Sequence, residues 1–251
     1  RITARTIGYA RWPAIELRLR ILWNEERMRL KLALPTVCAR DRVLCEILGG
    51  TAELPADGDE HVHARWCMLE GGGAAVGVAS CGLHGFDCLN GELRLSVLRG
   101  AAYCHEQHFE LGEYPARAFM DQGTHDVRLL VTAGTPEEVR ACLPGLADHL
   151  HAPPVAYAHL PIGERGAAQD GAPPFLTLAP AHVRLLACKR AADGEALIVR
   201  LQEGAGLPCT AALALHPPGL ALTLPLTPLQ IATLRIERSG AWRPVAMIEE
   251  E

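Results

Sequence analysis

Apolar and polar residues alternate along much of this chain. The segments Ile15-Glu-Leu-Arg-Leu-Arg-Ile21 and Met28-Arg-Leu-Lys-Leu-Ala-Leu34 each place apolar side chains on one face and arginine or lysine on the other. A period of two is typical of antiparallel strands with one face in a core and the other in water. The polar run Asn24-Glu25-Glu26 between these segments predicts a hairpin connection.

The same alternation recurs further along the chain, in Glu92 to Leu98, Asp126 to Val131, Val183 to Cys188, Ala196 to Leu201 and Ile231 to Ile236. Many short strands separated by turn residues predict an all-β fold. We expect a large antiparallel β-sandwich followed by a smaller β-sandwich.

One segment departs from the strand pattern. Thr135-Pro136-Glu137-Glu138 combines an N-cap residue, a proline at the first helical position and a glutamate at the third. This capping box predicts one short helix near residues 136–150. Proline inside a helix removes a hydrogen bond and clashes with the preceding turn, so we expect Pro144 to end or kink it.

Composition suggests where the domains meet. Residues 152–174 are rich in Pro, Gly and Ala, which is typical of a connection. We therefore expect a large β-sandwich domain over residues 1–155, truncated at its N-terminus, a connection over 156–174, and a small C-terminal β-sandwich over 175–251.

Charge and cysteine content exclude several classes of partner. The net charge of −5 provides no basic field for nucleic acid, and no apolar run is long enough to span a membrane. The nine cysteines form no Cys-x-x-Cys pair, which favours free, buried thiols in a reducing, cytoplasmic compartment over a disulfide framework.

Two histidine clusters suggest metal binding at first sight. They are His61-x-His63 and Cys104-His105-x-x-His108. A structural zinc site needs four ligands and a catalytic one needs three plus water, and neither cluster reaches that number by itself. We expect no metal to be held by this chain.

The run from Gly82 to His125 carries the most specific pattern. It contains Gly-Leu-His-Gly-Phe-Asp, then Glu-Leu-Arg-Leu-Ser-Val-Leu-Arg-Gly, then Asp-Gln-Gly-Thr-His. This order resembles the C-terminal β-rich region of glycoside hydrolase family 38, the retaining α-mannosidases. Collinear pieces elsewhere also resemble that family, namely Trp23-Asn-Glu-Glu, Cys45-Glu-Ile-Leu-Gly49, Arg65-Trp66, Ala187 to Glu203 and Pro228 to Arg235.

The chain also departs from the family pattern. Leu83-His84-Gly85-Phe86-Asp87 stands where the family usually has Lys-Tyr-Gly-Tyr-Asp, and the stretch from Tyr103 to Met120 is longer and richer in histidine than a short linker. Both departures concern the details of substrate binding and leave the expected fold unchanged.

The resemblance implies that this chain is the C-terminal portion of a zinc-dependent retaining α-mannosidase that hydrolyses terminal α-mannosides. The zinc and the two catalytic carboxylates would lie in an N-terminal catalytic domain of the same polypeptide, and the substrate would be a mannose-containing oligosaccharide. The chain has no His-x-Asp, a part of the family's zinc motif. By itself it is expected to be inactive and to contain no catalytic residue.

Three residues are candidates for substrate binding. The resemblance implies that Arg99, at the end of its strand, reaches the active-site cleft, where a guanidinium suits sugar hydroxyls or a carboxylate. An ion pair at a surface or domain contact explains the same arginine equally well. Asp121 and His125 would order a loop at the cleft, although Asp and Gly together also fit a local turn in which Asp121 caps backbone amides.

A stand-alone carbohydrate-binding or scaffolding β-sandwich without catalysis is the alternative. That alternative predicts a polar, finished surface around Arg99 and Asp121. A portion that has lost its partner domain would instead expose an apolar patch there.

Overall fold

The computed structural model describes the chain except for residues 39–41, 104–117, 156–173, 217–218 and 250–251. It divides into two compact units, Arg1–His151 and Ala152–Glu251. The predicted connection over 156–174 lies outside the described residues apart from Pro174. Antiparallel strands dominate both units, which confirms the predicted all-β class.

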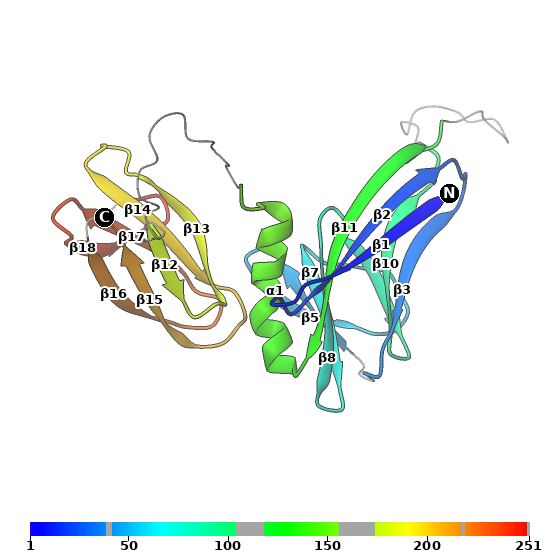
Figure 1. Ribbon diagram of the computed structural model, residues 1–251, viewed down its shortest axis with the longest axis horizontal. Helices are drawn as coiled ribbons and strands as arrows, with labels where there is room; N and C mark the ends of the chain where they lie inside the picture. Colours follow the sequence, from blue (N-terminus) through cyan, green and yellow to red (C-terminus); the bar gives the residue numbers. More distant parts are fainter. Residues whose placement is uncertain (39–41, 104–117, 156–173, 217–218, 250–251) are drawn as a thin grey trace, which may run out of the picture. The chain divides into compact units, whose positions relative to one another are not determined.

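The first unit contains a seven-stranded sheet with the order β1-β2-β11-β8-β7-β4-β5. All of its neighbouring strands are antiparallel. The bounds are β1 (Ile2–Gly8), β2 (Ile15–Trp23), β4 (Arg42–Ile47), β5 (Gly50–Pro55), β7 (Trp66–Gly71), β8 (Ala74–Ser80) and β11 (Gly123–Gly134). The strands β1, β2 and β11 lie side by side at one end of this sheet (Figure 1).

A four-stranded sheet packs against one face of the large sheet. Its order is β3-β10-β9-β6, with bounds β3 (Arg29–Pro35), β6 (His61–Val62), β9 (Gly85–Leu89) and β10 (Glu92–Arg99). Buried residues from both sheets form a single core, among them Ile21 and Leu129 from the large sheet and Phe86, Leu93 and Leu95 from the small one. This is the large antiparallel sandwich that the alternating pattern predicted.

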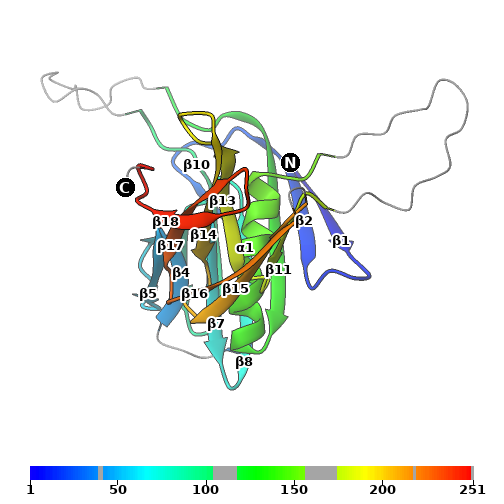
Figure 2. The same cartoon turned by 90° about the vertical axis from the view of Figure 1, so that its left-hand side faces the viewer.

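The helix α1 (Pro136–His151) packs on the opposite face of the large sheet, along β7, β8 and β11 (Figure 2). Its capping box forms as predicted, because the backbone amide of Glu138 donates to Thr135 Oγ1 at 3.3 Å and the amide of Thr135 donates to Glu138 Oε2 at 3.0 Å. Pro144 does not end the helix. Leu143 and Leu146 beside Pro144 are buried against the sheet, and this packing compensates for the lost hydrogen bond.

The second unit is a smaller sandwich of two sheets, with orders β12-β15-β16 and β13-β14-β17-β18. The bounds are β12 (Leu176–Ala179), β13 (Val183–Arg190), β14 (Ala196–Glu203), β15 (Cys209–Leu215), β16 (Leu220–Leu226), β17 (Ile231–Glu237) and β18 (Trp242–Val245). Its core includes Val199, Leu201, Leu213 and Leu234. Pro225 lies in β16, which is an edge strand and so tolerates a residue without an N–H.

A buried glutamate closes this second unit. Glu203, at the end of β14, is fully buried and accepts hydrogen bonds from the backbone amides of Ala205, Gly206, Leu207 and Leu229, at 2.7 to 3.1 Å. Four amides from two turns thus converge on one carboxylate. Glu203 ends the Val-Arg-x-x-Glu pattern that contributed to the family resemblance, and the structure gives it a structural role.

The eight cysteines in the described part of the chain are free thiols. Cys45, Cys67 and Cys88 are buried in the core of the first unit. Burial raises the pKa of the Cys45 thiol to about 11 and also raises the pKa of Cys67, so these thiols stay protonated and behave as small apolar groups. Cys81 and Cys188 are exposed, which the sequence-based expectation of buried thiols did not anticipate.

No described helix is both long enough and apolar enough to cross a membrane.

Candidate functional site

A β-bulge determines which way Arg99 points. Strict alternation from Leu93 and Leu95 would bring residues 97 and 99 to the core face. The register between β10 and β3 shifts between Ser96 and Leu98, so that Val97 and Leu98 are both buried and Arg99 is exposed. A bulge adds one residue to one strand and reverses the facing of every residue after it. Without this bulge Arg99 would point into the core.

Asp121 and His125 lie next to Arg99. The backbone amide of Arg99 donates to Asp121 Oδ2 at 3.0 Å, and His125 Nε2 contacts the Asp121 carbonyl oxygen at 2.8 Å. Asp121 adopts a left-handed conformation with a φ of 60°, which aspartate tolerates better than most residues. The structure therefore brings the three predicted residues together, and Asp121 reaches across to another strand.

The residue after Arg99 must be glycine, because the backbone at Glu25 passes very close to it. A Cβ atom on Gly100 would lie 2.2 Å from the Glu25 carbonyl oxygen, so only glycine fits there. The same carbonyl accepts a hydrogen bond from Gln122 Nε2 at 2.9 Å. The Trp-Asn-Glu-Glu turn is thereby joined to both the Arg99 end of β10 and the Asp121 segment.

The guanidinium of Arg99 is exposed, and within the described ranges no carboxylate forms an ion pair with it. Its cross-strand neighbour Arg29 differs, because Arg29 Nη1 donates to Glu60 Oε2 at 2.8 Å. The guanidinium of Arg99 is therefore available to bind a group outside the described residues, while its main chain is held in place. The surface ion pair that the sequence left open is not observed among the described residues.

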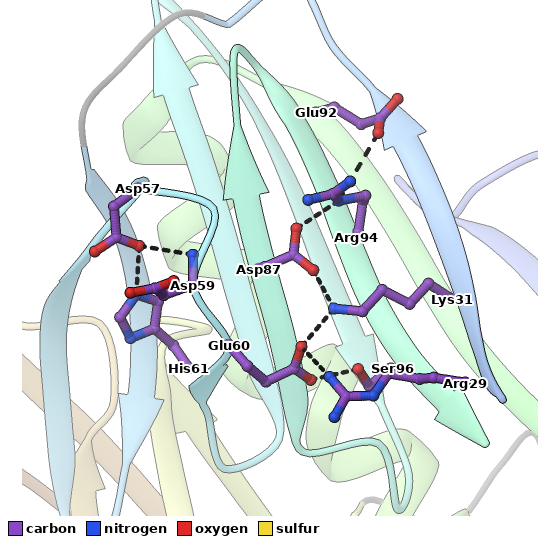
Figure 3. A network of polar contacts seen from close by, with 10 residues as sticks. All are labelled: Arg29, Lys31, Asp57, Asp59, Glu60, His61, Asp87, Glu92, Arg94 and Ser96. Carbon is purple, nitrogen blue, oxygen red and sulfur yellow. Dashed lines mark hydrogen bonds and ion pairs between the residues drawn. The ribbon is translucent and has the colours of Figure 1, made fainter. Parts of the chain in front are cut away.

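A second polar group occupies the outer face of the small sheet (Figure 3). Asp87, from the Gly-Phe-Asp motif, has a side chain only 3% exposed and binds both Lys31 and Arg94. Glu60 binds Lys31, Arg29 and Ser96. Sequence analysis missed this network, whose only signal was the polar face of several alternating strands.

The glycine of the same motif makes room for this network. A Cβ atom on Gly85 would lie 2.6 Å from Glu60 Oε1, so glycine lets the Glu60 carboxylate lie against the strand. Burial opposes ionisation of Glu60, but hydrogen bonds from Lys31 and Ser96 outweigh it and lower its pKa. A general acid of a glycosidase needs a raised pKa. The contacts of Glu60 with Arg29, Lys31 and Ser96 link strands β3 and β10 to the β6 segment.

The histidines considered as metal ligands are bound to a carboxylate, buried without a partner, or outside the described residues. His61 Nε2 contacts Asp57 Oδ1 at 3.0 Å. His63 is buried and neither ring nitrogen has a hydrogen-bond partner, and burial, together with the nearby charge of His84, lowers its pKa to about 4. Cys104, His105 and His108 lie outside the described residues.

Side chains that could bind a metal do not form a cluster in the part of the chain that the structure describes. No group of three or more His, Cys, Asp or Glu side chains could hold an ion there. A catalytic zinc needs three protein ligands and an open position. The described residues therefore do not fit a catalytic zinc site.

Comparison with known proteins supports the same family. Residues 1–107 match the family model of the glycosyl hydrolases family 38 C-terminal domain. The predicted resemblance to family 38 is confirmed. The matched residues include Arg99 but end before Asp121 and His125. No match was found among curated protein sequences.

Two solved structures share the fold over nearly the whole chain. One is an alpha-mannosidase from Enterococcus faecalis V583, with 17% identity and a TM-score of 0.74 over 94% of this chain and 29% of that one. The other is a protein in glycosyl hydrolase family 38 from Enterococcus faecalis, with 18% identity and a TM-score of 0.75 over 94% of this chain and 30% of that one. The chain thus spans less than a third of the length of either solved structure.

Proposed function

We propose that this chain is the C-terminal β-domain portion of a zinc-dependent retaining α-mannosidase that hydrolyses terminal α-mannosides. In this proposal an N-terminal catalytic domain of the same polypeptide contributes the zinc, a nucleophilic aspartate and an acid/base aspartate. A mannose-containing oligosaccharide is the substrate. The family 38 match and the length of the similar structures support the proposal.

The arrangement around Arg99 is the observation that carries this proposal. The Arg99 guanidinium is exposed and has no ion-pair partner in the described residues. The Arg99 backbone amide donates a hydrogen bond to Asp121 Oδ2 at 3.0 Å, which fixes the main chain there. A guanidinium has a planar set of donors that suits vicinal sugar hydroxyls or a carboxylate. We propose that Arg99 contacts the substrate or the catalytic domain, and that Asp121 and His125 position it.

The exposed apolar residues near Arg99 favour this proposal over the stand-alone binding module. Met28, whose carbonyl accepts a hydrogen bond from the Gly100 amide, and Tyr103 both expose large apolar side chains. A stand-alone module predicts a finished polar surface in this region. The proposal accounts for these two exposed side chains as part of a surface that meets another domain.

The decisive test uses the full-length parent polypeptide and an aryl α-mannoside. We expect Arg99→Gln to lower kcat/KM by about a hundredfold, because a positioned charged donor is lost from the cleft. The unfolding midpoint should not change, since the described residues form no ion pair with this guanidinium. Arg20→Gln, which alters an exposed arginine of the other sheet, is the matched control and should leave kcat/KM unchanged.

The positioning role of Asp121 needs a double-mutant cycle. If Asp121 acts through Arg99, then Asp121→Ala and Arg99→Gln together should cost no more kcat/KM than Arg99→Gln alone. Hydrolysis by the 251-residue chain alone, or an unchanged kcat/KM in Arg99→Gln, would contradict the proposed function.

A further inference from the structure

Three arginines lie in one row across the large sheet. The register places Arg5 of β1 opposite Arg18 of β2, and Arg18 opposite Arg128 of β11. Residues directly opposite each other in antiparallel strands share a face, with Cβ atoms about 5 Å apart. Like charges in such positions destabilise a sheet. Something must therefore compensate this arginine row, which consists of Arg5, Arg18 and Arg128.

Glu16 compensates part of the row. Its side chain is 1% exposed and accepts hydrogen bonds from Arg18 Nε at 2.7 Å, from Arg128 Nε at 2.8 Å and from the Tyr9 hydroxyl. One carboxylate thus faces two guanidinium groups. Arg5 has no side-chain ion pair within the described ranges.

The excess charge is local to this row. The next pair along the strands, Arg20 and Asp126, is neutral, with 3.9 Å between Arg20 Nε and Asp126 Oδ1. Three guanidinium groups and one carboxylate leave two positive charges around Glu16, in a chain whose net charge is −5. The Arg18 and Arg128 side chains remain 45% and 39% exposed, so this charge is accessible to solvent.

Aromatic rings lie beside the row. Tyr9 and Trp12 belong to the loop between β1 and β2, with ring centroids 5.1 Å apart, and Trp12 also contacts the His149 ring of α1 at 4.7 Å. The Tyr9 ring is exposed and its hydroxyl donates to Glu16. An accessible aromatic ring next to arginine donors can pack against the apolar face of a sugar while the arginines bind its anionic group.

We propose that the outer face of β1, β2 and β11, at Tyr9 and the arginine row, binds a phosphorylated sugar. A phosphate monoester carries close to two negative charges at neutral pH, which matches the two uncompensated positive charges, whereas a carboxylate carries only one. Arginine also binds phosphate oxygens in a bidentate way. This site shares no residue with Arg99, Asp121 and His125, so it is independent of the proposed function.

Calorimetric titration of the 251-residue chain with mannose 6-phosphate, mannose and inorganic phosphate tests the proposal. We expect mannose 6-phosphate to bind more tightly than either of its parts. Arg5→Gln should weaken this binding about tenfold through the loss of one charge-assisted contact. Arg20→Gln is the matched control on the neighbouring strand and should change the affinity less than about twofold, since Asp126 already faces Arg20.

Substitutions of Tyr9 separate sugar recognition from simple anion binding. Tyr9→Ala should weaken the binding of mannose 6-phosphate but not of inorganic phosphate, while Tyr9→Phe keeps the ring and should retain both. The proposal is overturned if mannose 6-phosphate binds no better than inorganic phosphate, if Arg5→Gln behaves like Arg20→Gln, or if no ligand shows saturable binding. It is also overturned if an oligoglutamate peptide binds more tightly than the sugar phosphate, because the face would then belong to an acidic protein partner.

Discussion

Among the described residues, each unit buries one glutamate completely, and the two units satisfy these carboxylates in different ways. In the second unit, Glu203 accepts four backbone amides from two turns. In the first, Glu16 is bound by the side chains of Tyr9, Arg18 and Arg128. A carboxylate bound by backbone amides fixes the path of the chain. One bound by partly exposed arginines organises charge on a surface.

The largest expected effect follows from removing the backbone-bound carboxylate. Glu203→Ala leaves four amides without their acceptor in a buried site, and we expect it to destabilise the second unit by about 4 kcal/mol. Urea unfolding followed by Trp242 fluorescence measures this loss. Glu195→Ala, at an exposed glutamate of the same unit, is the control and should leave the midpoint in place. If Glu203→Ala lowers the free energy of unfolding by less than about 1 kcal/mol, the two turns keep their conformation without the carboxylate.

His63 extends the comparison to a buried polar group that neither backbone nor side chain satisfies. Its folded-state pKa of about 4 lies below the ordinary value of 6.5, so the unfolded chain takes up the proton first as the pH falls. Stability should therefore drop between pH 6.5 and pH 4, by about 3 kcal/mol from this group. His63→Leu should remove that part of the drop, measured as the difference in unfolding free energy between pH 7 and pH 4. The same acid sensitivity in wild type and variant would contradict this assignment.

Glu16 titrates in a lower pH range. Hydrogen bonds from Arg18 outweigh the opposing effect of burial and, with those from Tyr9 and Arg128, lower its pKa from 4.5 to about 2. A lowered carboxyl pKa stabilises the fold above pH 4.5, and this contribution is lost as the pH falls toward 2. We expect about 2 kcal/mol, less than the full shift would give, because the partner arginines are partly exposed and screened.

The variant Glu16→Gln should lose this stability already at pH 7 and show a flatter acid profile than wild type. Asp126→Asn removes an exposed carboxylate from the same face and should leave the unfolding midpoint unchanged, because its pair with Arg20 is wide and exposed to solvent. Equal effects from the two substitutions would show that burial of Glu16 contributes nothing beyond its charge.

Alternation predicted the strands well but not the environment of their polar faces. The strands from Ile15, Met28, Glu92 and Asp126 all form near their expected places. Glu16 lies on the face expected to be in water, yet it is buried, because Tyr9 and two arginines from different strands converge on it. Such convergence depends on the register between strands, which one strand's own sequence does not contain.

In the helix and the candidate site, too, local features could be predicted from the sequence, whereas features that depend on distant residues could not. The capping box at Thr135 correctly predicted where α1 begins, since capping is local. Its continuation through Pro144 depends on packing against residues of β7 and β8 far away in the sequence. Arg99, Asp121 and His125 were chosen through a family pattern, and their meeting through the Arg99 amide required the fold.

The bulge in β10 adds one residue to the strand and so reverses the face of the sheet to which the residues after it point. A substitution at Val97 alters only how the core is filled, whereas a deletion of Val97 removes the extra residue and leaves Leu98 facing the core and Arg99 facing outward without a bulge. One residue inserted between Leu98 and Arg99 would instead reverse the facing of the arginine, which is a larger change for this surface than most substitutions in the strand. In comparisons among relatives, a one-residue gap at position 97 therefore marks the loss of the bulge, and an insertion after Leu98 marks a change in the facing of the arginine.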